Sequence, residues 1–240
     1  MKCTAAGLTD PGMVRPYNQD SYHIDSDNRF FIVADGMGGH AAGQEASRIA
    51  KDTICQYLEE KWSAPQSSEA LLEEAFLAAN QAILADQKTH PEREDMGTTA
   101  VAVMVRDGEV WCANLGDSRI YRWRDSEVEQ MTHDDTWVAQ AVAAGHIDPG
   151  DARSHPLRHV LAQCLGREDL GEVEVRPVEA KAGDRFLLCS DGLTEELPDP
   201  LIASYMQSSD LEQVTNKLVS AAKEMGGRDN ITVVVAYFEA

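Results

Sequence analysis

The stretch FFIVADGMGGH at residues 30–40 joins a short apolar, aromatic-rich run to an aspartate and a glycine-rich turn. Such runs are typical of buried strands, so we expect a strand over residues 30–34. A second stretch, FLLCSDGL at residues 186–193, repeats the order of apolar run, aspartate and glycine. We interpret the pair as two strand ends that face one site, and not as a true repeat.

Three more segments place an aspartate beside a glycine or a turn residue, namely RPYNQD at 15–20, GDSR at 116–119 and GGRDN at 226–230. Taken alone, each has a plain explanation, because Asp-Gly pairs are common turns and aspartate caps helices. Their joint occurrence beside strand-like runs instead indicates a shared site. The aspartates concerned are Asp20, Asp35, Asp117, Asp191 and Asp229.

Carboxylates that are brought together repel one another unless a cation lies among them. Glycine beside them allows the backbone to approach an ion or a phosphate closely. Oxygen ligands of this kind suit Mg²⁺ or Mn²⁺ and not zinc. The sequence therefore predicts a divalent metal site at one rim of a β-structure.

The remaining pattern favours antiparallel strands with helix pairs. Apolar residues recur at helical spacing over 46–58 and 71–83, which predicts a helical hairpin with Ser68 as the cap of its second helix. Hairpin signals follow over 98–115, around Asp107-Gly108, and over 120–131. A last helix is expected between Asp210 and Gly226, before a final strand over 231–237. Strands that follow strands predict an α+β domain.

Residues 132–166 form a long excursion between predicted strands, and such excursions are often lids or binding loops. Short helices are expected over 137–144 and 156–165. The segment contains His133, His146, His155 and His159. We do not favour zinc at His155 and His159, because Pro156 should begin the helix and leave His155 off its face. Surface or capping roles are expected for these histidines, with substrate contact by His159 as the functional alternative.

The bulk properties exclude several partners. The chain has 240 residues, is 43% hydrophobic and carries a formal charge of −20. That charge disfavours nucleic acid and anionic membranes, although bound metal ions would still admit a phosphate substrate. Five cysteines without a C-x-x-C pair indicate buried free thiols. No signal peptide or apolar span of about 20 residues is visible, so we expect a soluble, cytoplasmic protein, with a monomer as the default.

In chain order, the sequence carries the blocks R-x-x-N-Q-D, A-D-G-M-G-G-H, G-T-T-A, G-D-S-R, S-D-G-L and G-G-R-D-N between residues 15 and 230, within a resemblance that extends over residues 9–235. This ordered set resembles the metal-dependent type 2C family of protein serine/threonine phosphatases, in its bacterial branch. The compact length and the GRED segment at 166–169 are most similar to cyanobacterial single-domain members, including the phosphatase of the signal protein PII.

The resemblance implies a β-sandwich of two antiparallel sheets flanked by helix pairs, as one catalytic domain over residues 1–240 with a flap at about 132–166. It implies two Mg²⁺ or Mn²⁺ ions, and a third, weaker ion at Asp117 and Asp191. The core ligands would be Asp35, the Gly36 carbonyl, Asp191 and Asp229, with Asp20 reached through water.

In this family Arg15 would hold the substrate phosphate. The implied reaction is hydrolysis of phosphoserine or phosphothreonine on a protein by a metal-bridging hydroxide, without a phosphoenzyme. Many eukaryotic members carry a histidine, the proposed general acid, at the position of Met37, which cannot donate a proton. His40 is the nearest titratable substitute. A structural role for His40, with a metal-bound water as the acid, is the alternative.

Three other functions compete with this one. A cysteine-dependent phosphatase needs C-x₅-R, whereas Cys112 and Arg119 are separated by one residue too many, and Asp117 between them would raise the pKa of the thiol. A degenerate, non-catalytic phosphatase fold would bind phosphoproteins or metal only. A different two-metal hydrolase would act on phosphodiesters, but the acidic composition and the lack of histidine-rich ligand sets disfavour it.

Overall fold

Two antiparallel sheets lie face to face in the computed structural model, which describes residues 2–39 and 42–239. The first sheet has the order β1 (Cys3–Asp10), β11 (Ile231–Phe238), β10 (Arg185–Cys189), β7 (Arg119–Arg124) and β8 (Glu127–Gln130). The second has the order β2 (Asp20–Ile24), β3 (Phe30–Met37), β5 (Ala100–Arg106), β6 (Glu109–Leu115) and β9 (Glu174–Val178), with β4 (Gly97–Thr98) paired to β3.

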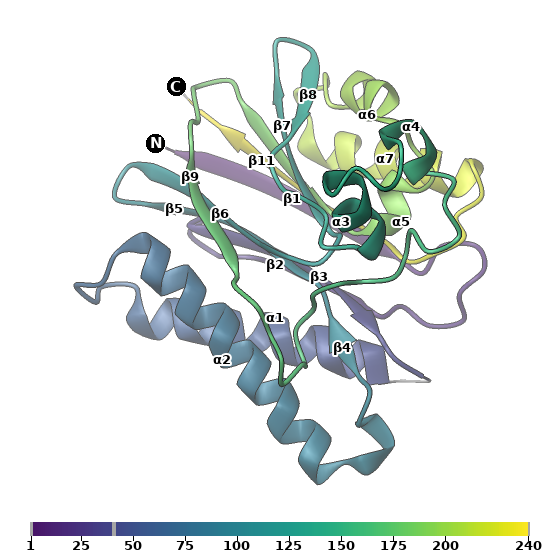
Figure 1. The fold of residues 1–240 in the computed structure, drawn as a ribbon. Helices are drawn as coiled ribbons and strands as arrows, with labels where there is room; N and C mark the ends of the chain where they lie inside the picture. The colour runs from purple at the N-terminus through teal and green to yellow at the C-terminus, as the bar shows by residue number, and fades with distance from the viewer. Residues whose placement is uncertain (1, 40–41, 240) are drawn as a thin grey trace.

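Helices cover the outer faces of the two sheets (Figure 1). The hairpin of α1 (Ala42–Lys61) and α2 (Ser68–Thr89), followed by the short 3₁₀ helix η1 (Pro91–Arg93), packs on the second sheet. The first sheet is covered by α5 (Asp191–Thr194), α6 (Asp199–Tyr205) and α7 (Leu211–Glu224). The predicted α+β class, with helices outside two antiparallel sheets, is confirmed.

Strand β3 shows why an uninterrupted apolar run specifies this arrangement. Phe30 and Ile32 pack toward α1 and α2, whereas Phe31 and Val33 pack between the two sheets. Successive side chains of a strand point to opposite faces, so a strand buried on both faces needs apolar residues throughout. Each such side chain contributes about 1.5–3 kcal/mol on burial. The run therefore fixes β3 at the centre of the molecule, and with it the position of Asp35.

Both predicted hairpins are confirmed. Asp107 and Gly108 have φ values of 53° and 84°, and Asp125 and Ser126 have 52° and 70°. These left-handed residues give the tight turns that match strand twist.

Two of the predicted helix ends are shifted by one residue from their expected places. Ser67, and not Ser68, caps α2 by accepting from the Ala70 N–H at 3.1 Å. The second shifted end is the C-cap of α7, which is Met225 and not Gly226, whereas the N-cap of that helix is the predicted Asp210.

The flap, residues 132–166, lies between β8 and β9 and holds α3 (Trp137–Ala143) and α4 (Pro149–Ala152). The first helix was predicted, but a helix over 156–165 is wrong. The end of that segment is extended, because the Leu165 N–H donates to the Thr98 carbonyl at 2.9 Å and the Ala162 N–H donates to the Asp135 carbonyl at 2.7 Å. Backbone pairing with distant residues overrides the helical spacing of its apolar side chains.

None of the helices in the described ranges combines the length and the apolar character needed to cross a membrane.

Candidate metal centre and phosphate site

Four of the predicted aspartates lie at neighbouring strand ends. Asp20 begins β2 and is the direct cross-strand partner of Asp35 on β3. In the other sheet β10 and β11 are antiparallel neighbours, with Cys189 opposite Val233. The segment after β10 therefore lies beside the segment before β11, and these segments carry Asp191 and Asp229. The two sheets bring together residues up to 209 positions apart in the chain, counted from Asp20 to Asp229.

The glycines after Asp35 and Asp191 are required for close backbone approach. A methyl group at Gly36 would collide with the carbonyl oxygen of Gly43 in α1. A methyl group at Gly192 would collide with the carbonyl oxygen of Asn230, next to Asp229. Neither glycine has a left-handed φ, and Asp35-Gly36 continues strand β3. The simple turn explanation of these two pairs is therefore wrong.

Hydroxyl groups connect the sheets at Asp20, which is buried. Its Oδ2 accepts hydrogen bonds from Ser190 Oγ at 2.8 Å and from Thr232 Oγ1 at 2.7 Å. Its Oδ1 is buried and finds no partner among the described residues. Ser190 and Thr232 are not among the site residues predicted from the sequence, although Ser190 stands inside the S-D-G-L block.

A second hydroxyl chain fixes Asp35 relative to Asp117, which lies in the turn between β6 and β7. Thr99 Oγ1 accepts from the Asp35 N–H at 3.1 Å and lies 2.7 Å from Ser118 Oγ. Thr98 Oγ1 donates to the Asp35 carbonyl at 2.8 Å. The G-T-T-A block thus holds the backbone of Asp35, and its second threonine reaches the neighbour of Asp117.

The site is short of positive charge. Burial, with the charge of Asp191, raises the pKa of Asp20 to about 6, although hydrogen bonds from Thr232 and Ser190 oppose the shift. Burial, followed by the charges of Asp20 and Asp191, raises the pKa of Asp35 well above its usual range. Burial and the charge of Asp191 do the same for Asp117. A cation among these carboxylates would remove the repulsion.

The donor set fits divalent metal. Asp191 Oδ1, like Asp20 Oδ1, is buried without a partner among the described residues, so both oxygens have free coordination capacity. Carboxylates and a backbone carbonyl are hard oxygen ligands, as Mg²⁺ and Mn²⁺ require. Orphaned buried oxygens are costly unless a ligand satisfies them.

Arg15 lies beside this cluster on an exposed loop. Its Nη2 is 2.6 Å from Asp229 Oδ2, and 51% of its side chain is exposed. The loop is held by Asn230, which is buried. The Asn230 amide donates to the carbonyls of Pro11, at 3.1 Å, and Tyr17, at 2.9 Å, and its oxygen accepts from the Gln19 N–H at 2.8 Å. Asn230 thus positions the loop that carries Arg15.

A cleft of about 510 Å³ is bordered on the flap side by His159 and Leu161, and Arg15 lines it together with all the predicted aspartates except the buried Asp20. His159 Nδ1 lies 3.7 Å from Asp191 Oδ2, and its side chain is 48% exposed. The carboxylate of Asp191, with that of Glu195, raises the pKa of His159. The structure therefore brings His159, which is titratable, to the cleft. Met37 lines the same cleft but has no titratable group.

His40, the predicted general acid, lies outside the described residues. The flap histidines other than His159 are placed as surface or capping groups. His133 is exposed beside Glu174, and His155 Nδ1 accepts from the Leu157 N–H at 3.1 Å. His146 is exposed.

The cysteine mechanism has no support in the structure. All five cysteines are buried and free. Cys112 lies within β6, and burial raises the pKa of its thiol to about 12. A thiol in that state is not a nucleophile at neutral pH.

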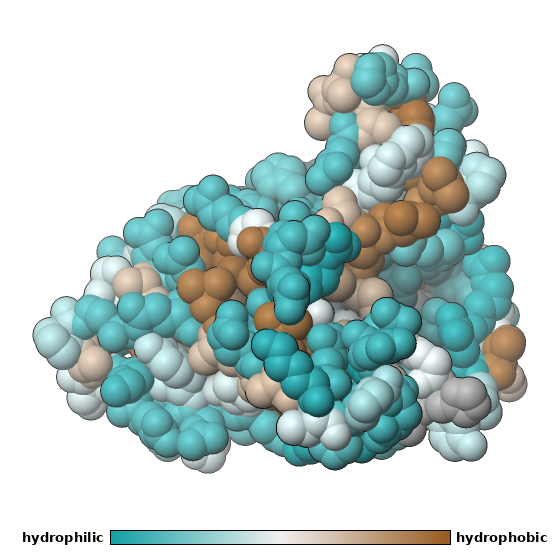
Figure 2. All heavy atoms as spheres, turned by 60° about the horizontal axis from the view of Figure 1, so that its bottom comes forward, coloured by the Kyte–Doolittle hydropathy of each residue, from teal (hydrophilic) through white to brown (hydrophobic). Residues whose placement is uncertain are grey.

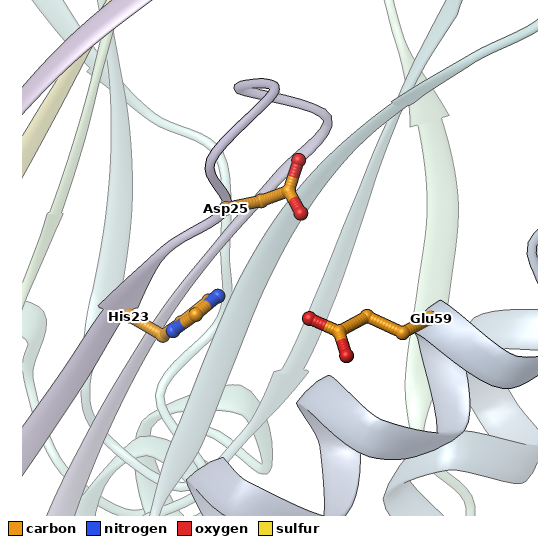
Figure 3. A group of neighbouring side chains, drawn as sticks. All are labelled: His23, Asp25 and Glu59. Atoms are coloured by element: carbon orange, nitrogen blue, oxygen red, sulfur yellow. The ribbon is translucent and has the colours of Figure 1, made fainter.

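A separate group of His23, Asp25 and Glu59 has side chains that converge between β2 and α1 (Figure 3). Both Asp25 oxygens are already bonded to the Arg29 guanidinium, at 2.8 Å and 2.6 Å. The Asp25 carboxylate also accepts from the backbone N–H groups of Asp27 and Arg29, so it orders the turn before β3. The bound guanidinium already neutralises the carboxylate charge that would attract a metal ion, so we assign no metal to this group.

Comparison with known proteins agrees with the geometry. Residues 15–225 match the family model described as protein phosphatase 2C. The chain is 38% identical to the serine/threonine protein phosphatase PstP of Mycobacterium tuberculosis over 96% of its own length, but spans only 44% of that relative. It is 34% identical to the serine/threonine phosphatase stp of Listeria monocytogenes, and the match covers 95% of this chain and 92% of that one.

Solved structures show the same fold. A crystal structure of the M. tuberculosis phosphatase PstP superposes with a TM-score of 0.92 at 38% identity, covering 99% of each chain. The catalytic domain of PstP in complex with two manganese ions gives a TM-score of 0.87 at 35% identity, again over 99% of each chain. This chain belongs to the protein phosphatase 2C family.

Proposed function

We propose that this chain is a metal-dependent protein phosphatase that hydrolyses phosphoserine and phosphothreonine on proteins. The observation that carries the proposal is a cluster of aspartates, two of which have a buried oxygen without a partner among the described residues, beside an arginine that is exposed to the same cleft. Such a cluster suits divalent cations, and an arginine fork suits a phosphate group.

In this proposal Asp35, the Gly36 carbonyl, Asp191 and Asp229 hold two Mg²⁺ or Mn²⁺ ions, with Asp20 acting through water. Asp117, with Asp191, would take a third, weaker ion. When bound, such ions stabilise charge on phosphate oxygens and lower the pKa of a coordinated water. The manganese ions of the PstP structure support this donor set, because that fold is shared.

The remaining roles belong to the protein's own side chains. Arg15 binds two oxygens of the substrate phosphate and orients it for attack in line with the departing serine or threonine oxygen. Asp229 holds the Arg15 guanidinium in the cleft at 2.6 Å. Met37 cannot protonate the leaving oxygen, so we assign that proton to His40. His159 is proposed to contact the protein part of the substrate.

The proposal is tested with three substrates and two metal conditions. The purified protein should hydrolyse p-nitrophenyl phosphate and a phosphothreonine peptide in Mn²⁺ or Mg²⁺, and lose both activities in EDTA. Bis-p-nitrophenyl phosphate, a diester, should remain intact. Full activity in metal-free buffer would contradict the metal centre, preferential diester cleavage would favour another two-metal hydrolase, and no turnover at all would favour a binding module.

Narrower features are also proposed. Residues 1–240 act as one catalytic domain, in the cytoplasm and as a monomer. A phosphorylated PII signal protein is the candidate substrate, on the resemblance of the sequence to cyanobacterial members of the family. Release of phosphate from phosphorylated PII, compared with an unrelated phosphoprotein at equal concentration, would test that candidate.

A further inference from the structure

Exposed large hydrophobic side chains are concentrated in chain segments that adjoin residues of the cleft, although none of these side chains is itself a lining residue. In the part of the chain that the structure describes, they are Met13, Val14, Tyr17, Leu77, Trp137, Leu157, Val160 and Met225. All but Leu77 belong to the loop that carries Arg15, to the flap, or to the end of α7 just before Asp229. The face drawn in Figure 2 is mostly hydrophilic, with hydrophobic side chains gathered in a few groups. Gathered apolar groups beside a site indicate binding.

The loop over residues 11–19, here the Arg15 loop, presents three of these side chains. Met13, Val14 and Tyr17 are 64%, 66% and 63% exposed. On a loosely held loop, such side chains could fold back onto the protein. This loop is fixed at both ends, because Asn230 binds the backbone at Pro11, Tyr17 and Gln19, and the Met13 N–H donates to the Gly227 carbonyl at 2.7 Å.

A fixed loop lowers the entropic cost of using its side chains in binding. The position of the loop also limits what it can contact. Consecutive Cα atoms are about 3.8 Å apart, so Val14 adjoins Arg15. A residue next to a phosphorylated serine or threonine lies within the same short reach of the phosphate. An apolar side chain beside the bound phosphate would therefore meet the exposed side chains of this loop.

We propose that Met13, Val14 and Tyr17 form an apolar wall that binds a bulky apolar side chain adjacent to the phosphorylated residue of the substrate. The inference rests on the proposed phosphatase function and adds a substrate preference to it. A charged flank gains little in the neighbouring groove, because its Glu195, Glu196 and Asp229 are already paired with arginines. The wall selects an apolar flank over a polar one.

The test uses two phosphothreonine peptides that differ only in the residues flanking the phosphothreonine, leucine in one and serine in the other. The quantity measured is the ratio of kcat/KM for the leucine peptide to that for the serine peptide. We expect a ratio of about tenfold in the wild type, the order that a hydrophobic contact supplies. The double substitution Val14→Ser/Tyr17→Ser should reduce the ratio below about twofold, since one wall of the contact is lost.

Leu77→Ser is the matched control, because Leu77 is an exposed hydrophobic residue on α2, away from the cleft. It should keep the wild-type ratio. Because the ratio compares two substrates of one protein sample, a partial loss of folded protein lowers both kcat/KM values equally and leaves the ratio unchanged.

Three outcomes would overturn the inference: a wild-type ratio near one, a ratio that survives the double substitution, or an equal fall in Leu77→Ser. A changed oligomeric state of the double variant in sedimentation, with an unchanged ratio, would make the wall an interface between copies and would also overturn it. Hydrolysis of neither peptide by the wild type would instead refute the proposed function itself.

Discussion

The metal centre and the flap lie on opposite sides of one cleft, and they are built in opposite ways. The aspartates lie at or beside strand ends, and the buried hydroxyls of Ser190, Thr232 and Thr99 hold Asp20 and Asp35 in place. The flap has two short helices and extended segments. It meets the opposite wall through polar contacts such as the Arg158–Glu195 pair at 3.2 Å.

The difference separates chemistry from recognition. Groups that must hold a fixed geometry are placed where a rigid scaffold determines it. Groups that meet a variable protein partner lie on a segment with few buried apolar contacts, which can open at low cost. If that division is correct, changes at the aspartates should abolish turnover of every substrate, whereas changes in the flap should discriminate between substrates.

The largest effect is expected at Asp35. Asp35→Ala removes a carboxylate from the centre of the cluster, and we expect kcat to fall by at least about 10²-fold, as for loss of transition-state charge stabilisation. The measurement is steady-state turnover of p-nitrophenyl phosphate and a phosphopeptide in saturating Mn²⁺. Asp27→Asn, at an aspartate whose side chain is 74% exposed, is the control and should be neutral. Near-normal kcat in a folded Asp35→Ala protein would remove Asp35 from the site.

Metal should also stabilise the fold, because it relieves repulsion among buried carboxylates. Mn²⁺ at about 100 times its dissociation constant should add about 2.7 kcal/mol to the free energy of unfolding. For a chain of this size that corresponds to a Tm rise of about 5–10 °C over the EDTA form. The comparison is a thermal melt with and without EDTA. Asp35→Ala should lose most of the Mn²⁺-dependent rise in Tm. A wild-type Tm that does not change when Mn²⁺ is added would argue against a metal centre.

A smaller, more selective effect is expected at Arg15. Its fork should bind phosphate in both the ground state and the transition state, so Arg15→Ala should raise KM more than it lowers kcat. A rise of about tenfold corresponds to about 1.4 kcal/mol. Arg15→Lys keeps the charge but loses the fork, and should fall between wild type and Arg15→Ala. An unchanged KM on p-nitrophenyl phosphate would place Arg15 outside the phosphate site.

The sequence was informative where local pattern and tertiary structure agree. Apolar runs that end in Asp-Gly located Asp35 and Asp191, because a strand buried on both faces must be apolar throughout. Strand β1, CTAAGLTD, was missed because it is an edge strand of intermediate burial and lacks such a run. Its pairing with β11, from Cys3 opposite Phe238 to Asp10 opposite Ile231, is a long-range contact that local pattern does not show.

The supporting hydroxyls were missed for the same reason. Thr232 is hidden in a strand-like run, and its bond to Asp20 depends on how the sheet that holds β11 packs on the sheet that holds β2. In the flap, local pattern predicted a helix that the structure does not have. Residues 156–165 have helical spacing, but the extended pairing of Leu165 with Thr98 satisfies the backbone better than an isolated short helix would.

The smallest predicted effect tests the flap against the metal centre directly. His159 is 48% exposed and lies 3.7 Å from Asp191, beyond hydrogen-bonding distance, so its removal should leave the carboxylate cluster in place. His159→Ala should slow turnover of a phosphoprotein or phosphopeptide, while p-nitrophenyl phosphate turnover stays within about threefold, or about 0.7 kcal/mol. His146→Ala, at an exposed histidine elsewhere in the flap, should affect neither substrate. An equal loss on both substrates in His159→Ala would place His159 in the chemistry or in the positioning of Asp191. The division between a rigid catalytic centre and a substrate-selective flap would then be wrong at His159, the flap residue that lies beside the aspartate cluster.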